Sequence, residues 1–197
     1  MLFIQMTGLS GAGKSTIAQT AKNILVDLGY KVELLDGDDY RRHLCRDLGF
    51  SKTDRLENIN RLGFVGLTLA RHGVIAIMAA INPYEEAREN LKRKSSLVKT
   101  IFVDCPLSIT SKRDPKGLYR RVFLPEDHPD HIGHFTGVSD PFEVPENPDL
   151  TIPTSQQTIE ESATMLVNFI LQNIEAIVPR SQDLVAQYVA QQDMVFA

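Results

Sequence analysis

Short apolar runs alternate along the chain with longer segments in which apolar residues recur at helical spacing. The runs predict five strands, at 2–6, 31–35, 74–78, 99–103 and 150–152. The intervening segments predict helices at about 14–28, 38–46, 54–72, 84–94 and 155–176. Because strands that alternate with helices form parallel sheets covered on both faces, we expect an α/β fold with a five-stranded parallel sheet and helices on both faces.

The pattern breaks down between residues 123 and 148, where Pro, Gly, His and Asp follow one another with little periodicity. This stretch is too long for a simple connection in a compact domain. Loops of this kind are commonly active-site lids. We therefore expect a mobile lid over about 123–148.

Length, composition and charge narrow the classes of protein. The 197 residues are 43% hydrophobic and 23% charged, as in ordinary globular domains. The net charge of −4 leaves no positive field for a nucleic-acid backbone, so we expect no nucleic-acid partner. No apolar run approaches the ~20 residues that cross a bilayer, and no basic, cleavable leader opens the chain. We expect a cytoplasmic enzyme without a membrane partner, in which Cys45 and Cys105 stay thiols.

Residues 8–15 match the phosphate-binding pattern Gly-x-x-x-x-Gly-Lys-Ser in full, directly after a predicted strand and at the head of a predicted helix. Its glycines let backbone N–H groups converge on phosphate oxygens at the positive end of the helix. Lys14 is expected near the β and γ phosphates, and Ser15 is expected to offer its hydroxyl to Mg²⁺. The motif predicts a P-loop NTPase fold with ATP and Mg²⁺ as cofactors. The expected nucleotide-binding residues of this loop are Gly8, Ser10, Gly11, Ala12, Gly13, Lys14, Ser15 and Thr16.

Acidic residues follow the second predicted strand, at Asp36, Asp38 and Asp39. Ligands bind at the carboxyl ends of strands in open α/β sheets. Phosphoryl transfer needs one group that orients the acceptor hydroxyl and another that holds the metal's water shell, because the reaction depends on placement and charge neutralisation. We assign Asp38 to the first role and Asp36 to the second. A helix N-cap with an acidic first turn is the alternative for Asp38 and Asp39.

Further motifs resemble the adenylylsulfate kinase family. They are Asp36-Gly37-Asp38 with Arg41, LCRDLGFS at 44–51, DR at 54–55, ENI at 57–59, NPY at 82–84, VDCP at 103–106, RDPKGLY at 113–119, FTG at 135–137 and PENP at 145–148. The resemblance runs from about residue 2 to 176 and is far more specific than the phosphate loop alone. Members of the family transfer the γ-phosphate of ATP to the 3′-hydroxyl of adenosine 5′-phosphosulfate, which gives ADP and 3′-phosphoadenosine 5′-phosphosulfate, the activated sulfate donor.

The resemblance implies a site for the phosphosulfate substrate and a contact with ATP. The residues that would form the substrate site are Asp38, Arg41, Phe50, Arg55, Asn58, Asn82, Pro83, Arg88 and Phe135. Asp38 would orient the 3′-hydroxyl, and Phe50 and Phe135 would stack on either side of the substrate's adenine. Arg113 would lie against the adenine of ATP. Ordinary core aromatics are the alternative for the two phenylalanines.

Three positions depart from the family pattern. Asn82 stands where the family commonly has a serine, so a phosphoserine cannot form there. Glu85 replaces a usual arginine and puts an anion close to the expected substrate, although the second arginine is present as Arg88. Gly133 aligns with a usual lysine of the lid. These changes favour, as an alternative, a kinase for a different nucleotide-like anion; a nucleotide-binding module without turnover is the other alternative.

Three histidines, His128, His131 and His134, lie within the predicted lid. Their spacing suits a zinc site, because imidazole is a common zinc ligand. A partial substitute for the missing lysine is the second interpretation, and solvated loop residues are the third.

The motifs predict one P-loop kinase domain over residues 1–177 and a C-terminal helical extension over 178–197. Within the extension, residues 181–189 have the pattern of a short amphipathic helix. Its apolar side is expected to pack on its own domain. A contact in a homodimer is the alternative.

Overall fold

The five apolar runs form the strands of one parallel sheet, and each predicted strand is confirmed to within one residue at either end. The computed structural model describes residues 1–177. The strands are β1 (Phe3–Thr7), β2 (Val32–Asp36), β3 (Ile75–Ala79), β4 (Val98–Asp104) and β5 (Leu150–Pro153). They lie in the order β2-β3-β1-β4-β5. This order puts β1, with the phosphate-binding pattern at its carboxyl end, in the middle of the sheet.

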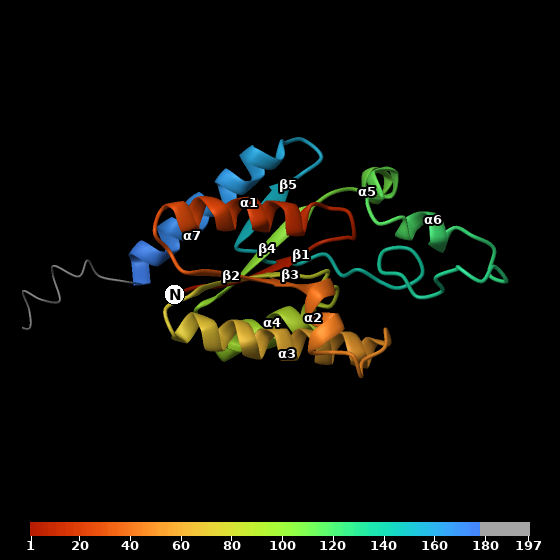
Figure 1. The fold of residues 1–197 in the computed structure, drawn as a ribbon, viewed down its shortest axis with the longest axis horizontal. Coiled ribbons are helices and arrows are strands. Elements are labelled where there is room, and N and C mark those ends of the chain that lie inside the picture. Colours follow the sequence, from red (N-terminus) through yellow and green to blue (C-terminus); the bar gives the residue numbers. More distant parts are fainter. Residues whose placement is uncertain (178–197) are drawn as a thin grey trace, which may run out of the picture.

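Helices cover both faces of the sheet, as the alternation predicts (Figure 1). The helices are α1 (Lys14–Asp27), α2 (Gly37–His43), α3 (Lys52–Arg71), α4 (Glu85–Lys94), α5 (Leu107–Arg113), α6 (Leu118–Val122) and α7 (Ile159–Ile177). The helices α1 and α7 lie together on one face, and α3 and α4 lie on the other. None of the helices within residues 1–177 has the length and apolarity that a membrane span requires.

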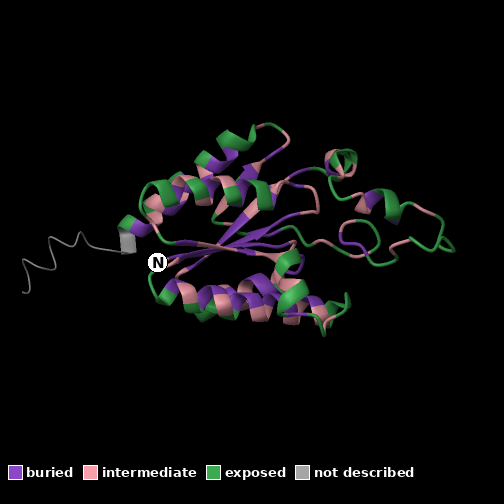
Figure 2. Cartoon of the chain, viewed as in Figure 1, coloured by how far each residue is buried: buried purple, intermediate pink, exposed green. Residues whose placement is uncertain are grey.

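Two hydrophobic layers hold the sheet between the helices, and Figure 2 shows the buried strands between them. Neighbouring residues of β1 point into opposite layers: Ile4 packs with α1 and α7, whereas Phe3 packs with α3 and α4. Because both faces of each central strand are covered, β1 and β3 are buried along their whole length. This explains why β3 appears in the sequence as a continuous apolar run. In β1 the run is interrupted by Gln5 and Thr7, which are buried with hydrogen-bond partners.

The helix boundaries and two short helices differ from the expectation. The last helix starts at Ile159 and not at 155, because Thr158 and Glu161 close its first turn with reciprocal side-chain bonds to each other's backbone N–H. The second helix ends at His43, three residues early. Helices α5 and α6 were not predicted, since seven and five residues are too short to show a helical period.

The segment expected to form a lid, 123–148, consists of turns and extended chain with one isolated bridge between Thr136 and Asp140. It projects beyond the carboxyl edge of the sheet next to α6 (Figure 1). Arg55 of α3 ties it down through Thr136 and Asp140. The mobility of this segment stays a prediction. The expected C-terminal helix at 181–189 lies outside the described residues.

Candidate active site

A cavity of about 1020 Å³ opens along the carboxyl edge of the sheet. Residues that follow all five strands line it, so the sheet order decides what lies where. The phosphate-binding loop after β1 forms the middle, the segments after β2 and β3 form one side, and those after β4 and β5 form the other. The volume is at the upper end of the ~300–1,000 Å³ usual for small-molecule pockets.

The phosphate-binding loop has the backbone that its glycines permit. Gly11 and Gly13 have φ values of +74° and +104°, in the left-handed region that favours glycine. Ser10 through Thr16 all line the cavity. Gly8 does not line it: a Cβ at this position would lie 2.5 Å from the Val103 carbonyl oxygen, so Gly8 allows the loop to pass β4 closely.

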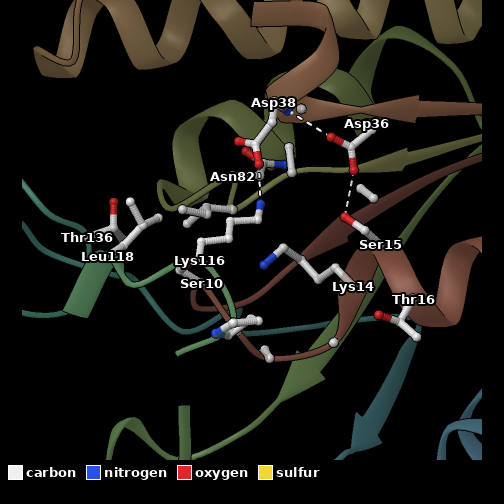
Figure 3. A pocket seen from close by; sticks show the side chains of 18 of the residues that line it. Ser10, Lys14, Ser15, Thr16, Asp36, Asp38, Asn82, Lys116, Leu118 and Thr136 are labelled. Carbon is white, nitrogen blue, oxygen red and sulfur yellow. Dashed lines mark hydrogen bonds and ion pairs between the residues drawn. The ribbon is translucent and has the colours of Figure 1, made fainter. Parts of the chain in front are cut away.

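Lys14, in the first turn of α1, is buried at the floor of the cavity (Figure 3). Its ammonium donates hydrogen bonds to the carbonyl oxygens of Gly8 at 2.8 Å and Leu9 at 2.7 Å. Burial, and next the repulsion of Lys116, lower the pKa of Lys14 to about 7 against the attraction of Asp38 and Asp36. An anion that enters the cavity would therefore raise this pKa again.

Asp36 is the N-cap of α2, which settles how the acidic cluster is arranged. Its Oδ1 accepts hydrogen bonds from the backbone N–H groups of Asp38 and Asp39, at 3.0 and 3.3 Å. Its Oδ2 accepts a hydrogen bond of 2.6 Å from the Ser15 hydroxyl (Figure 3). The alternative for Asp38 and Asp39 was an N-cap with an acidic first turn. Both residues lie in the acidic first turn of α2, and the N-cap is Asp36.

Ser15 and Asp36 bring a hydroxyl and a carboxylate oxygen together beside the phosphate-binding loop. Oxygen ligands of this kind are those that Mg²⁺ prefers, and Mg²⁺ usually keeps several waters and takes further ligands from substrate phosphates. Within residues 1–177, acidic residues, histidines and cysteines form no cluster of three that could hold a metal. The pair thus fits a metal held largely by water and phosphate.

Asp38 points into the cavity, where its carboxylate contacts the ammonium of Lys116 (Figure 3). Lys116 comes from the connection between α5 and α6, 78 residues away in the chain. Both side chains are more than half exposed, so the contact is open to exchange with a ligand. Lys116 was not predicted as a site residue; its only signal in the sequence is its place within the motif at 113–119.

The side of the cavity next to β2 and β3 is basic and contains two unpaired oxygens. The Arg41 guanidinium lies 4.5 Å from the centre of the exposed Phe50 ring. Arg55 is buried and already paired with Asp140 at 2.9 Å. Asn58 Oδ1 is buried without a hydrogen-bond partner, and so is the Oδ1 of Asn82. This side therefore offers positive charge and hydrogen-bond acceptors.

Phe50 and Phe135 both line the cavity, in different surroundings. Phe50 is 58% exposed, which does not fit an ordinary core aromatic. Phe135 is buried and packs edge-on against Tyr119, with ring centres 4.9 Å apart, in a small cluster with Val122. The structure thus brings both rings to one cavity, while their stacking on a base stays a prediction.

Arg88 and Glu85 do not line the cavity. Arg88 is fully buried, and its guanidinium pairs with Glu85 and donates to the carbonyl oxygens of Asn82 and Glu143 at 2.7 Å each. The expectation that Glu85 presents an anion to the substrate is therefore wrong, because a buried guanidinium needs a carboxylate partner and Glu85 supplies it. Arg88 lies behind the cavity and supports Asn82.

Asn82 and Pro83 follow β3 and line the cavity. Asn82 has a φ of +44°, a left-handed conformation for which asparagine is enriched. Its side-chain Nδ2 donates to the Gln5 side-chain oxygen at 3.2 Å, and its backbone carbonyl oxygen accepts from the Thr7 hydroxyl at 2.9 Å. These contacts hold the turn after β3 against the end of β1.

The other side of the cavity is built from the connections after β4 and β5. Arg113 donates to the Thr154 carbonyl oxygen at 2.7 Å, and the Thr154 hydroxyl donates to the Ala12 carbonyl oxygen at 2.8 Å. These bonds fix both connections against the phosphate-binding loop. Gln157 and Ser162, which sequence analysis missed, also line this side.

The three lid histidines contact different partners. His128 Nδ1 accepts from the Asp130 N–H at 3.1 Å, and His131 Nδ1 lies 2.9 Å from the Leu124 carbonyl oxygen. Of the three, His134 lines the cavity, and its Nδ1 lies 3.3 Å from Asp140 Oδ1. The histidines therefore do not converge on a zinc site within the described residues.

The chain is similar to known proteins over most of its length. A family profile described as adenylylsulphate kinase matches residues 1–153. The adenylyl-sulfate kinase of Microcystis aeruginosa is 47% identical over 165 residues, which cover 84% of this chain and 88% of that protein. The adenylyl-sulfate kinase of Deinococcus deserti is 44% identical, with the same two coverages.

Solved structures of kinases also resemble this chain. An APS kinase of Mycobacterium tuberculosis, in complex with AMPPNP and APS, superposes with a TM-score of 0.78 at 37% identity and covers 85% of this chain and 95% of its own. A gluconokinase from Sinorhizobium meliloti superposes with a TM-score of 0.56 at 16% identity, covering 90% and 97%, and shares the fold alone. The family profile, the sequence identity to adenylyl-sulfate kinases over most of the chain and the shared fold show that the chain belongs to the adenylylsulfate kinase family, kinases that use ATP to phosphorylate adenosine 5′-phosphosulfate.

Proposed function

We propose that the cavity holds ATP and adenosine 5′-phosphosulfate together, with ATP on the β4 and β5 side and the acceptor on the β2 and β3 side. The observation that carries this proposal is the place of Asp38, which reaches the middle of the cavity from the acceptor side and faces the phosphate-binding loop. A carboxylate between a phosphate site and an acceptor site can orient a hydroxyl toward the γ-phosphate.

On the donor side, the backbone N–H groups of residues 10–16 would bind the phosphates, and Lys14 would neutralise charge on the β and γ phosphates. Arg113, held by Thr154, would lie against the adenine of ATP. Ser15 and Asp36 would hold Mg²⁺, which when bound supplies additional positive charge at the phosphates.

On the acceptor side, the chemistry suits an anionic nucleoside. The unpaired oxygens of Asn58 and Asn82 can accept hydrogen bonds from ribose hydroxyls or an exocyclic amino group. Arg41 supplies positive charge for a phosphosulfate, and Arg55 would join it by exchanging its bond to Asp140 for one to the substrate. Phe50 and Phe135 supply ring surface for a base. Since Glu85 pairs with Arg88 outside the cavity, it gives no reason to prefer a different acceptor.

In the proposed reaction, Asp38 accepts a hydrogen bond from the 3′-hydroxyl and aligns its oxygen with the γ-phosphorus. The bond from the 3′-oxygen to this phosphorus forms as the bond to the β,γ-bridging oxygen breaks, the hydroxyl proton passes to Asp38, and ADP leaves. Lys14 and Lys116 stabilise the charge of the transferred group. Lys116 reaches the phosphates by giving up its contact with Asp38.

The test replaces Asp38 by asparagine and follows ADP release with adenosine 5′-phosphosulfate as acceptor. We expect kcat to fall by roughly 10²- to 10⁴-fold, because the amide keeps the shape but cannot take the proton, while the Kd for ATP changes little. Asp39→Asn is the matched control, since Asp39 is exposed and contacts Arg42 and His43.

Three results would count against the proposal. An Asp38→Asn variant that keeps its rate would remove Asp38 from the reaction. A panel of nucleotide-like anions in which another acceptor reacts faster than adenosine 5′-phosphosulfate would favour the different-acceptor kinase. No ADP release with any acceptor would favour the binding module without turnover.

We also retain, as part of the proposal, a cytoplasmic location and a kinase domain at 1–177 with a separate C-terminal extension, for which a contact in a homodimer is the alternative to packing on its own domain. The free thiols of Cys45 and Cys105 lie in opposite hydrophobic layers, where they cannot pair with each other. Light scattering of the full chain tests the homodimer against the single-chain mass of 22.0 kDa.

A further inference from the structure

Four buried side-chain oxygens have no hydrogen-bond partner within the described part of the chain, and all four belong to residues that line the cavity. Two of them, on Asn58 and Asn82, lie on the acceptor side. The other two, Gln157 Oε1 and Ser162 Oγ, lie on the donor side and have no role in the phosphate chemistry. Buried polar atoms are almost always paired, so an unpaired one beside a ligand cavity points to a ligand atom.

The surroundings of these two oxygens indicate which part of a nucleotide they would meet. Gln157 lies in the connection from β5 to α7, and Ser162 lies in the first turn of α7, where it is 1% exposed. Thr154, in the same connection, is bonded both to the phosphate-binding loop and to Arg113. If Arg113 lies against the adenine, as proposed above, the base lies next to this connection, because Arg113 is bonded to the Thr154 carbonyl oxygen within it.

We propose that Gln157 reads the 6-position of the donor's purine and makes this kinase prefer 6-aminopurine donors, with Ser162 as a second polar contact to the base. This inference rests on the proposed function, because it places the donor nucleotide on the β4 and β5 side. The exocyclic amino group of adenine donates a hydrogen bond to Gln157 Oε1, the buried end of the amide. Guanine and hypoxanthine carry an oxygen acceptor there, so two acceptors would face each other.

The experiment compares ATP with ITP, whose base, hypoxanthine, has an oxygen in place of the 6-amino group. For the unmodified chain we expect kcat/KM with ATP to exceed that with ITP by roughly 10- to 100-fold. Gln157→Leu should bring the ratio close to one, mainly by reducing activity with ATP. Gln157→Glu should keep the preference, since a carboxylate accepts but does not donate. Gln156→Leu is the matched control, because Gln156 is exposed and does not line the cavity.

A second measurement follows binding without turnover, as the increase in Tm that ADP or IDP produces at equal concentration. We expect a larger increase with ADP for the unmodified chain and for Gln157→Glu, equal increases for Gln157→Leu, and smaller increases with both nucleotides for Ser162→Ala. Equal use of ATP and ITP by the unmodified chain, or an unchanged ratio in Gln157→Leu, overturns the inference and means that water pairs these oxygens. If adenosine 5′-phosphosulfate is not phosphorylated with either donor, the proposed function fails, and the Tm measurement still decides the base preference.

Discussion

Raising the pH above neutrality should weaken nucleotide binding through Lys14. The pKa of this residue is lowered to about 7 in the cavity, chiefly by burial. Bound phosphates would stabilise the ammonium, so above pH 7 the nucleotide binds with uptake of a proton. Affinity is therefore full below pH 7 and falls as pH rises, because the neutral amine must first be protonated.

The magnitude follows from this pKa. Relative to pH 6, the Kd should rise about twofold at pH 7, about tenfold at pH 8 and about a hundredfold at pH 9. Each tenfold step corresponds to about 1.4 kcal/mol of binding free energy. The predicted slope of log Kd against pH thus approaches one between pH 8 and 9.

Calorimetric titration with a non-hydrolysable ATP analogue measures the Kd and the number of protons taken up on binding. The pH series gives the slope, and two buffers of different ionisation enthalpy at pH 8 give the protons taken up. Lys14→Met should bind weakly and without this slope. Lys116→Met removes the second cause of the lowered pKa, so the onset of the slope should move to higher pH. Lys112→Met, exposed and outside the cavity, is its control.

A Kd that stays constant between pH 7 and 9, with no proton uptake at pH 8, would refute this reasoning. It would mean that the two carbonyl oxygens bonded to Lys14 keep the ammonium charged in spite of its burial.

Two substitutions test the positions that depart from the family pattern. Asn82→Ser should leave the steady-state rate within a few-fold, because direct transfer needs no phosphate on the enzyme; covalent labelling of the native chain by γ-labelled ATP would contradict this. Glu85→Arg should lower the free energy of unfolding by about 3 kcal/mol, since it puts a like charge beside the buried Arg88. Urea denaturation measures this loss, and Glu86→Arg on the exposed neighbour is its control, expected to change stability little; equal losses would show that the buried pair is not the cause.

The sequence by itself determined the sheet, its two helical layers and the phosphate-binding loop. These follow from local pattern: the strands are short and mainly apolar, the central strands β1 and β3 are buried because both faces are covered, and the loop needs glycine at positions of positive φ. The motifs after β2 and β4 likewise belong to single short segments, so their place at the carboxyl edge followed once the strands were assigned.

Only the tertiary structure decided which of these residues face one another. Asp38 and Lys116 are 78 residues apart in the chain, and their contact depends on how the connection between α5 and α6 returns over the cavity. The partner of Glu85 also follows from the structure alone. The sequence shows an anion next to a substrate motif, whereas in the structure Glu85 pairs with the buried Arg88 outside the cavity. Gln157 and Ser162 carry no sequence signal, because their interest comes from being buried, unpaired and beside the phosphate-binding loop at once. Burial and pairing are properties of the packed chain, and no local pattern contains them.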